Sequence, residues 1–491
     1  MQNDIDRPTC NCGIIGVIGT PDASLIAYYG LHALQHRGQE ASGILTLSSE
    51  NNKPHFNIHK GLGLVSEVFE DSTIFQNQLS GIAAIGHNRY STTGASESRK
   101  NIQPFFVNYR LGNLAIAHNG NLTNSKKIRE KLVDEGAIFQ TTSDTEVILH
   151  LIARSKIEDQ IGQVREALSK VEGAYSIVIL TNDKLIAARD PNGFRPLCIG
   201  KINDAYVITS ETCALDINSA EYIREIEPGE IVSIEKEGES LKIKSFKNEN
   251  SQSAKSHCIF EFIYFSRPDS HIFGTNVDKM RRKLGKTLAK NHPVSADPND
   301  KVIVISVPDS SNTTAIGYHS QLQKDGINSK LEIGLIRSHY IGRTFIAPTQ
   351  ESREIGVKIK FNIVKGVLEN KVVVVIDDSI VRGTTSKSLV KLLREANPKS
   401  IHFRISSPPI ISPCFYGMDF PSKEELIANK FDSNIEEIRK YLDVDSLEYL
   451  TVDEMLDAMT DHKRTDFCSA CFSGHYPLRI ENEFQKDQYE Y

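Results

Sequence analysis

The sequence lacks the features that mark two large classes of protein. Its 57 Lys and Arg residues against 63 Asp and Glu residues give a net charge of -6, without the basic excess that nucleic-acid binding requires. Its longest apolar runs, such as Val372 to Ile376, are far shorter than the roughly 20 residues that span a bilayer. We therefore expect neither a nucleic acid nor a membrane as a partner.

Cysteine is also scarce, and no export signal is visible. Eight cysteines in 491 residues are too few for a disulfide scaffold. Residues 1–11 have no apolar core and so resemble neither a secretory signal nor a transit peptide. The sequence thus predicts a protein of the reducing cytosol, whose cysteines are reactive, metal-bound or buried. With 39% hydrophobic residues, the chain can form two to four domains of roughly 150 residues each.

The pattern of the sequence changes near residue 250. The first half predicts strands at 13–17, 43–47, 83–90, 114–117, 175–180, 185–188 and 206–209, and helices at 24–36, 126–135, 145–154 and 164–170. This order indicates strands layered with helices. The polar stretch 247–256 predicts a linker. Beyond it, apolar runs at 302–307, 372–376 and 401–405 alternate with helical segments, which predicts a doubly wound parallel sheet. Residues 423–460 have helical spacing.

Cys12 opens the first predicted strand, in the motif Cys-Gly-Ile-Ile-Gly. A lone cysteine before a strand is most often a small buried hydrophobe. Three polar clusters change this interpretation: 86–92 (GHNRYST), 118–122 (HNGNL) and 142–146 (TSDTE). Each follows an apolar run, and the loops at strand ends are where a rigid scaffold displays catalytic groups.

Together these segments resemble the glutaminase domain of the N-terminal nucleophile amidotransferases. The resemblance implies an αββα layered fold over residues 12–245, and a propeptide, residues 1–11, that is cleaved between Asn11 and Cys12. Cys10 is the competing candidate, but it lacks the Cys-Gly-Ile-x-Gly context. In this family the freed cysteine is the nucleophile, and its own α-amine is a base of suitable pKa, about 7.7 to 8.0.

The resemblance also implies the residues that stabilise the reaction and bind glutamine. Asn119, through its side chain, and Gly120, through its N–H, would form the oxyanion hole. Arg89 would pair with the α-carboxylate of glutamine and Asp144 with its α-ammonium group. Arg37 would help to shape the same pocket. The alternatives are a surface ion pair for Arg89 and a helix N-cap for Asp144.

Two adjacent acids follow the valine run of the second half. Asp377 and Asp378 end a buried strand, and a Gly-Thr-Thr sequence leads from them into a helix. Doubly wound sheets bind ligands at such strand ends, and a helix N-terminus favours an anion. The alternative is a solvated strand end followed by an ordinary N-cap.

The whole stretch 372–385 resembles the fingerprint that type I phosphoribosyltransferases use for 5-phosphoribosyl-1-pyrophosphate (PRPP). The resemblance implies that Asp377 and Asp378 bind the ribose hydroxyls, directly or through one Mg²⁺, with Ser310 near the metal. It implies a transferase domain over residues 257–410. The stretch 336–348 would form a lid over PRPP. The predicted PRPP-binding residues are Asp377, Asp378, Ser379, Val381, Arg382, Gly383, Thr384 and Thr385, with Arg343 from the lid.

Four cysteines complete the resemblance. Cys468 and Cys471 form a C-x-x-C pair, which is moderately specific for a metal or redox site. With Cys258 and Cys414 they match the iron–sulfur subgroup of glutamine PRPP amidotransferases, which implies one structural [4Fe–4S] cluster. A Cys₄ zinc site is the alternative. The C-terminal extension, residues 411–491, would be helical and would bind this cluster. The remaining Cys198 and Cys213 are expected to be buried thiols.

The combined resemblance implies an enzyme that makes 5-phosphoribosylamine, glutamate and pyrophosphate from glutamine, PRPP and water, at the entry to purine synthesis. It also implies a homotetramer that purine nucleotides inhibit. Another amidotransferase with the same glutaminase half is disfavoured by the Asp377-Asp378 fingerprint. A regulatory protein that binds PRPP without catalysis is disfavoured because it would need a basic DNA-binding module.

Overall fold

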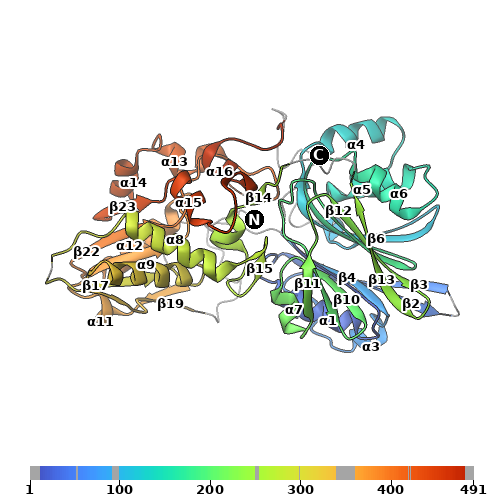
Figure 1. Ribbon diagram of the computed structural model, residues 1–491, viewed down its shortest axis with the longest axis horizontal. Helices are drawn as coiled ribbons and strands as arrows, with labels where there is room; N and C mark the ends of the chain where they lie inside the picture. The colour runs from blue at the N-terminus through green and yellow to red at the C-terminus, as the bar shows by residue number, and fades with distance from the viewer. Residues whose placement is uncertain are drawn as a thin grey trace.

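The computed structural model describes residues 12–50, 53–90, 99–248, 254–297, 299–338, 360–418, 420 and 422–480. The expected propeptide, its cleavage site and Arg343 with most of the expected lid lie outside these residues. The described chain forms two lobes, with the N-terminal half in one and the C-terminal half in the other (Figure 1). In the part that is described, no helix has the length and apolar character needed to cross a bilayer.

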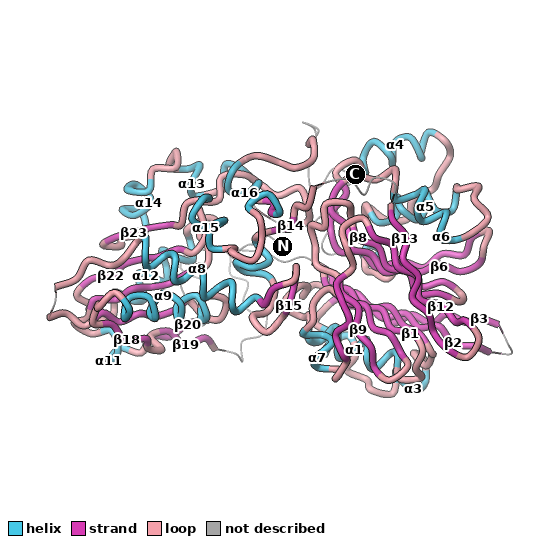
Figure 2. The backbone as a smooth tube through the Cα atoms, viewed as in Figure 1, coloured by secondary structure: helices cyan, strands magenta, loops and turns pink. Residues whose placement is uncertain are grey.

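The first lobe contains two antiparallel sheets stacked face to face (Figure 2). One sheet has the order β11 (Glu221–Glu225), β9 (Cys198–Ile202), β10 (Ala205–Thr209), β1 (Gly13–Ile18), β4 (Ala83–Arg89), β2 (Ala41–Glu50) and β3 (Lys53–Leu62). The other has the order β13 (Ser240–Lys247), β12 (Glu230–Glu237), β8 (Lys184–Arg189), β7 (Gly173–Thr181), β6 (Gly112–Leu122) and β5 (Phe105–Tyr109).

Helices cover the outer face of each sheet. The first sheet is covered by α1 (Ala23–Ala33), α2 (Val65–Val68), α3 (Ile74–Asn77) and α7 (Cys213–Ile217), and the second by α4 (Ser125–Asp134), α5 (Thr145–Arg154) and α6 (Gln160–Leu168). Strand residues alternate between the core that the sheets share and the cores under the helices. Ile14 of β1 and Ala117 of β6 belong to the shared core, whereas Ile15 and Ile116 face helices. The predicted αββα architecture is confirmed.

The second lobe is built on a five-stranded parallel sheet. Its order is β18 (Ser329–Leu331), β17 (Val302–Ser306), β21 (Val372–Asp377), β22 (Ser400–Ile405) and β23 (Ser446–Tyr449). Helices α8 (Val277–Asn291), α9 (Asn312–Lys324) and α15 (Val452–Ala458) pack on one face, and α12 (Thr384–Arg394) and α14 (Ile435–Leu442) pack on the other. Alternate valines of β21 enter these two cores, as expected of a strand buried on both faces. The predicted doubly wound sheet is confirmed.

The stretch 423–460 differs from its helical expectation in one respect. Besides α13 (Ile427–Lys430), α14 and α15 it contains β23, whose Leu447 pairs with Phe403 of β22. Four residues are too few to show a period of two against the helical spacing on either side. The C-terminal segment therefore supplies an edge strand to the parallel sheet.

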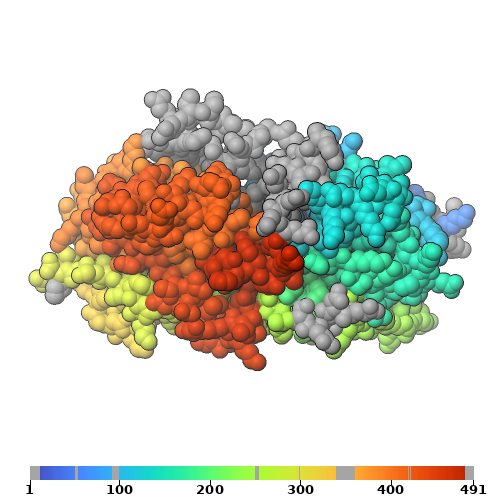
Figure 3. Space-filling model, turned by 90° about the horizontal axis from the view of Figure 1, so that it is seen from above, coloured from blue at the N-terminus to red at the C-terminus, as the bar shows by residue number. Residues whose placement is uncertain are grey.

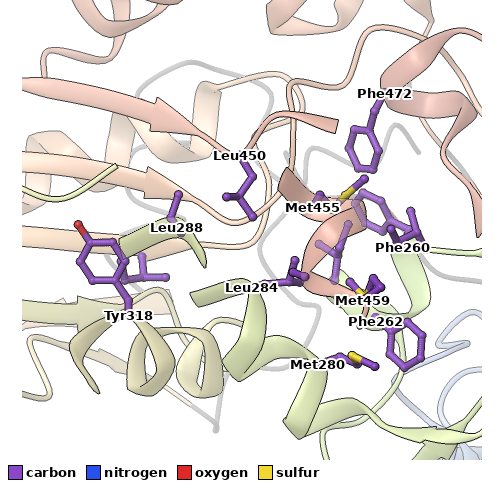
Figure 4. Close-up of a cluster of buried hydrophobic side chains, with 14 of the residues drawn as sticks. Phe260, Phe262, Met280, Leu284, Leu288, Tyr318, Leu450, Met455, Met459 and Phe472 are labelled. Atoms are coloured by element: carbon purple, nitrogen blue, oxygen red, sulfur yellow. The ribbon is translucent and has the colours of Figure 1, made fainter. Parts of the chain in front are cut away.

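The C-terminal tail is attached to the chain between the lobes. The short strand β24 (Phe467–Cys468) pairs in parallel with β14 (His257–Cys258), and α16 (Ala470–Ser473) follows it. Phe472 of α16 packs on Phe260, at a ring-centroid distance of 5.8 Å, in the apolar core that α8 and α15 share (Figure 4). In the space-filling view, part of the red C-terminal region borders the first lobe (Figure 3).

Candidate active sites

Cys12 immediately precedes β1, and its position follows from the alternation of that strand. Ile14 and Ile18 point into the core between the two sheets. Cys12 lies two residues before Ile14 and therefore faces the same side. On β6, Ala115 and Ala117 point into this core as well, and Asn119 continues their series. Two strands from different sheets thus direct Cys12 and Asn119 toward the region between the sheets, and the pocket at Cys12 is lined by Gly120 but not by Asn119.

The Cys12 thiol is almost enclosed. It is 8% exposed and donates a long hydrogen bond to the carbonyl oxygen of Tyr90, at 3.5 Å. Burial raises the pKa of Cys12 to about 11, because the thiolate loses its hydration. The thiol is therefore protonated at neutral pH, and nucleophilic attack requires a nearby base.

Asn119 is a buried amide whose own hydrogen bonds are unmet. Its side chain is fully buried, and both its Nδ2 and its Oδ1 lack a hydrogen-bond partner within the described structure. Leaving such a group unpaired costs about 1–3 kcal/mol, so a functional reason is expected. Next to it, Gly120 has φ +148, and a Cβ there would lie 2.0 Å from the carbonyl oxygen of Ala174. Only glycine fits this strand position.

Arg89 and Asp144 line the same pocket as Cys12 and Gly120. Arg89 ends β4 and lies 4.0 Å from Glu40, with only 4% of its surface exposed. The expected alternative, a surface ion pair, therefore does not describe it. Asp144 does occupy the N-cap position of α5, but its side chain makes no capping bond and accepts from the N–H of Leu122 instead, at 2.9 Å.

The pocket also contains residues to which the sequence assigned no role. His118 lies beside Thr145, at 3.0 Å, and Gln103 binds both the His118 N–H and the Thr145 hydroxyl. His87 approaches the carbonyl oxygen of His118, at 3.1 Å, and burial lowers its pKa to about 3. Both histidines lie within the motifs 86–92 and 118–122, so their place in those motifs could have identified them as residues of the site. Because His87 is neutral, the positive charge on this side of the pocket comes from Arg89.

Of the three predicted glutamine-binding residues Arg37, Arg89 and Asp144, all in the described chain, Arg37 is the one that does not line the pocket. It is fully buried, and its guanidinium contacts Glu211 of the first lobe and Glu261 of the second, the latter at 2.6 Å. Burial would lower the pKa of Arg37, but the two carboxylates more than offset this and raise it. Ser266 accepts a further hydrogen bond, at 3.0 Å. Arg37 therefore joins the two lobes.

We expect the substitution Arg37→Met to lower the free energy of unfolding by about 3–5 kcal/mol, because it leaves two buried carboxylates with fewer partners. The measurement is chemical denaturation of the full chain. Arg154→Met is the control, since its ion pair with Glu135 is largely exposed and such pairs contribute little. Equal stability of the two variants would contradict the assigned bridge.

The acidic pair lies at the carboxyl end of β21, at the centre of the parallel sheet. Asp377 and Asp378 are 5% and 1% exposed. Ser311, at the start of α9, donates to Asp377 at 3.2 Å, and Ser310 donates to Asp378. The loop after β17 therefore meets the loop after β21, as expected for neighbouring parallel strands.

The segment after the acids leads into α12, which begins at Thr384. Ser379 donates to Asp378 at 2.9 Å, and Gly383 occupies the N-cap with φ +80. A Cβ at Gly383 would lie 2.2 Å from Ile427, so the turn requires glycine. No acidic side chain occupies the first turn, at Thr384 and Thr385, which keeps this helix end favourable to an anion.

Two residues of this segment, Val381 and Arg382, contact the chain around residue 425. The carbonyl oxygen of Val381 accepts from the N–H of Ile427, at 2.8 Å, and Arg382 pairs with Glu425 at 3.3 Å.

Arg281 is a residue near this site that the sequence analysis did not identify. It is buried and donates to the carbonyl oxygens of Ser266, at 2.8 Å, and Ser310, at 3.4 Å, so it holds the loop that carries Ser310.

The four cysteines predicted to act together line one cavity at the junction of the lobes. Cys258 lies on β14, Cys468 on β24 and Cys471 on α16, and Cys414 belongs to the loop that follows β22. Apolar and aromatic side chains form the rest of the wall: Phe194, Tyr416, Met418, Ala470 and Tyr476. Segments more than 200 residues apart in sequence thus bring four thiols to one space.

The thiols surround this space rather than one point. Among the described residues, no three His, Cys, Asp or Glu side chains form a group close enough for a single metal ion. Burial raises the pKa of Cys258 to about 11 and that of Cys471 well above its ordinary value. The N–H of Tyr416 donates to the sulfur of Cys414, at 3.3 Å. The cavity is thus lined by sulfur atoms and by apolar and aromatic side chains.

Comparison with known proteins agrees with this architecture. Residues 87–216 match the model of a glutamine amidotransferase domain. The chain is 49% identical to amidophosphoribosyltransferase 1, chloroplastic, of Arabidopsis thaliana, over 97% of this chain and 80% of that protein. It is 47% identical to the amidophosphoribosyltransferase of Bacillus subtilis, over 96% of this chain and 94% of that protein.

Two solved structures match over nearly the whole length. One, described as the allosteric regulatory enzyme of purine biosynthesis, has a TM-score of 0.87 and 45% identity, covering 96% of this chain and 97% of that one. The glutamine PRPP amidotransferase of B. subtilis in complex with ADP and GMP has a TM-score of 0.85 and 46% identity, covering 96% and 98%. The chain therefore belongs to the amidophosphoribosyltransferase family.

Proposed function

We propose that this protein converts glutamine, PRPP and water to 5-phosphoribosylamine, glutamate and pyrophosphate, the first step of purine biosynthesis. The observation that carries the proposal is the presence in one chain of two sites, the Cys12 pocket and the acidic pair at the end of β21. The family's name describes the same two-part chemistry. Amidotransferases that couple the same glutaminase half to a different synthase are disfavoured by this second site.

In the first site, the Cys12 sulfur would attack the side-chain carbonyl carbon of glutamine. The α-amine of Cys12, freed by removal of residues 1–11, would accept the thiol proton and pass it to the departing ammonia. A γ-glutamyl thioester forms as the C–N bond breaks, and water then releases glutamate. The raised pKa of the thiol supports the need for this base. Cleavage before Cys12 is part of the proposal.

Asn119 and Gly120 would stabilise the oxyanion, and Arg89 and Asp144 would hold the two ends of glutamine. The unpartnered amide of Asn119 supports its assignment, because a donor without a partner in the resting site is available to the developing charge. Arg89 can form charge-assisted hydrogen bonds with a carboxylate. Asp144, already fixed by the Leu122 N–H, can accept from an ammonium group.

Replacing Asn119 with alanine should lower the glutamine-dependent kcat by about 10²- to 10³-fold, as expected when one oxyanion donor is lost. The ammonia-dependent reaction should be unchanged. Steady-state kinetics with each nitrogen donor measures both. Asn218→Ala is the control, because that amide donates to the carbonyl oxygens of Ile26 and Ala214, remote from the pocket. Equal losses with both donors would reject the assignment.

In the second site, ammonia would displace pyrophosphate from C1 of the ribose. Asp377 and Asp378 would bind the ribose hydroxyls and one Mg²⁺, and residues 379–385, the loop before α12 and the first two residues of that helix, would bind the 5′-phosphate. The donor set fits, since Mg²⁺ is usually held by one or two carboxylates together with substrate phosphates. Bound there, the ion would neutralise charge on the leaving pyrophosphate. Arg343 and the expected lid would enclose the site.

The four cysteines of the cavity would hold one [4Fe–4S] cluster. The residues fit, because four thiols line an apolar space and iron–sulfur clusters are bound by four thiolates. A Cys₄ zinc site is the alternative, because four sulfurs alone do not determine which metal is bound. The cluster would tie the tail to the rest of the chain, since the proposed reaction transfers no electrons.

Iron and sulfide analysis after anaerobic purification should give about four of each per chain. Cys471→Ala should lose the iron and unfold at a lower temperature. Cys213→Ala, which removes a buried thiol from α7, should keep the iron. Stoichiometric zinc in place of iron would reject the cluster.

Regulation, assembly and location are also part of the proposal. The B. subtilis structure contains ADP and GMP, which supports feedback inhibition of this chain by purine nucleotides. A homotetramer and a cytosolic location remain predictions from the sequence, and curated relatives in plants are named chloroplastic. The domain limits at 245, 257 and 410 likewise remain predictions.

A further inference from the structure

The loop that follows Cys414 lies directly against the strand of the predicted oxyanion hole. The side-chain amide of Asn121, on β6, donates to the carbonyl oxygen of Phe415 at 3.0 Å. Gly417 touches the backbone of Gly120 so closely that a Cβ on Gly417 would lie 3.0 Å from the Gly120 carbonyl carbon. Loop 414–418 is therefore the back wall of this part of β6.

Arg195 holds the loop in place. Two of its guanidinium nitrogens donate to the carbonyl oxygen of Tyr416, at 3.2 and 2.7 Å, and a third donates to Glu261 at 3.3 Å. Both charged side chains are fully buried. The ring of Tyr416 stacks on Phe194, next to Arg195, at 4.2 Å. A buried charge from the first lobe thus fixes a loop of the second lobe beside Gly120.

We propose that Gly417 and Arg195 are positioning residues for the oxyanion hole. The inference rests on the proposed glutaminase function of Cys12, Asn119 and Gly120. A donor must lie within a narrow distance of the oxyanion to stabilise it, and β6 at Gly120 has a φ of +148 that few residues adopt. If loop 414–418 is displaced toward Gly120 or away from it, the Gly120 N–H therefore moves relative to the substrate.

The test is the variant Gly417→Ala, compared with Gly474→Ala. Both glycines have positive φ, +101 and +73, so both variants carry backbone strain. A Cβ at Gly474, which ends α16, meets nothing closer than 3.6 Å. The two variants therefore differ in whether the new methyl group presses on Gly120. Thermal unfolding of both measures the shared strain.

We expect Gly417→Ala to lower the glutamine-dependent kcat by up to about 100-fold, the effect of a misplacement of about 1 Å. The KM for glutamine should change less than threefold, and the ammonia-dependent rate should stay within twofold. Alkylation of Cys12 by chloroacetamide should keep its rate, since that displacement forms no oxyanion, while formation of the glutamyl thioester slows. Gly474→Ala should keep all these rates.

A second pair of variants tests Arg195. Arg195→Met removes both bonds to Tyr416 and should reproduce the loss in glutamine-dependent kcat, whereas Arg195→Lys, which keeps one charged donor, should restore part of it. The inference is overturned if Gly417→Ala matches Gly474→Ala, or if it lowers the ammonia-dependent rate equally. Glutamine turnover that survives Cys12→Ala would instead refute the proposed function.

Discussion

Replacing Cys12 with alanine should abolish the glutamine-dependent reaction and leave the ammonia-dependent reaction at its original rate. The expected loss in kcat is at least about 10⁴-fold, because the nucleophile has no substitute. The second site, in the other lobe, contains no part of this pocket, so added ammonia bypasses the defect. Pyrophosphate release from PRPP with each nitrogen donor measures both rates.

Cys198 offers a matched control. Like Cys12 it is a buried thiol that donates to a backbone carbonyl oxygen, that of Thr209 at 3.4 Å, and burial raises its pKa well above the ordinary value. Cys198→Ala should keep activity with glutamine. If Cys12→Ala used glutamine normally, another nucleophile would have to be found.

Replacing Asp377 with asparagine should impair the reaction with either nitrogen donor. The substitution keeps the shape of the side chain but removes a negative charge from the proposed Mg²⁺ and ribose site. Loss of several kcal/mol of charge stabilisation corresponds to roughly 10²- to 10³-fold in rate. Hydrolysis of glutamine at the Cys12 site should continue, which separates this defect from that of the nucleophile.

Asp300→Asn is the control for the acidic pair, because Asp300 lies at the surface of the same lobe and pairs with Lys399 at 2.8 Å. Its kinetics should match those of the unmodified chain with both donors. A variant at Asp377 that lost only the glutamine reaction would contradict the assignment of glutamine hydrolysis to the first lobe and of pyrophosphate displacement to the second.

Local patterns predicted much of this molecule. The valine run before Asp377 identifies a strand buried on both faces, and the motifs around Cys12 and Asn119 lie at the ends of predicted strands. These predictions succeed because the order of apolar and polar residues within one short segment indicates whether one or both faces of a strand are buried. The parallel sheet followed from such patterns, whereas the αββα layers were implied by the family resemblance.

Contacts between the lobes could not be predicted in this way. Glu211, Glu261 and Arg195 are ordinary charged residues in the sequence, and their partners lie up to 224 positions away. The close approach of Gly417 to Gly120 likewise arises only when the second lobe packs on the first. The role of Arg37 therefore differs from its expectation, since its partners come from both lobes.

The parallel pairing of β14 with β24 determines when the sulfur-lined cavity can exist during synthesis. Cys258 leaves the ribosome 213 residues before Cys471, which corresponds to roughly 10 to 40 seconds at about 5–20 residues per second. During this interval a nascent chain can complete its first lobe, but it cannot enclose a cofactor between these strands. The proposed cluster can therefore be enclosed only when translation has nearly ended, at a time when the first lobe has had the chance to fold.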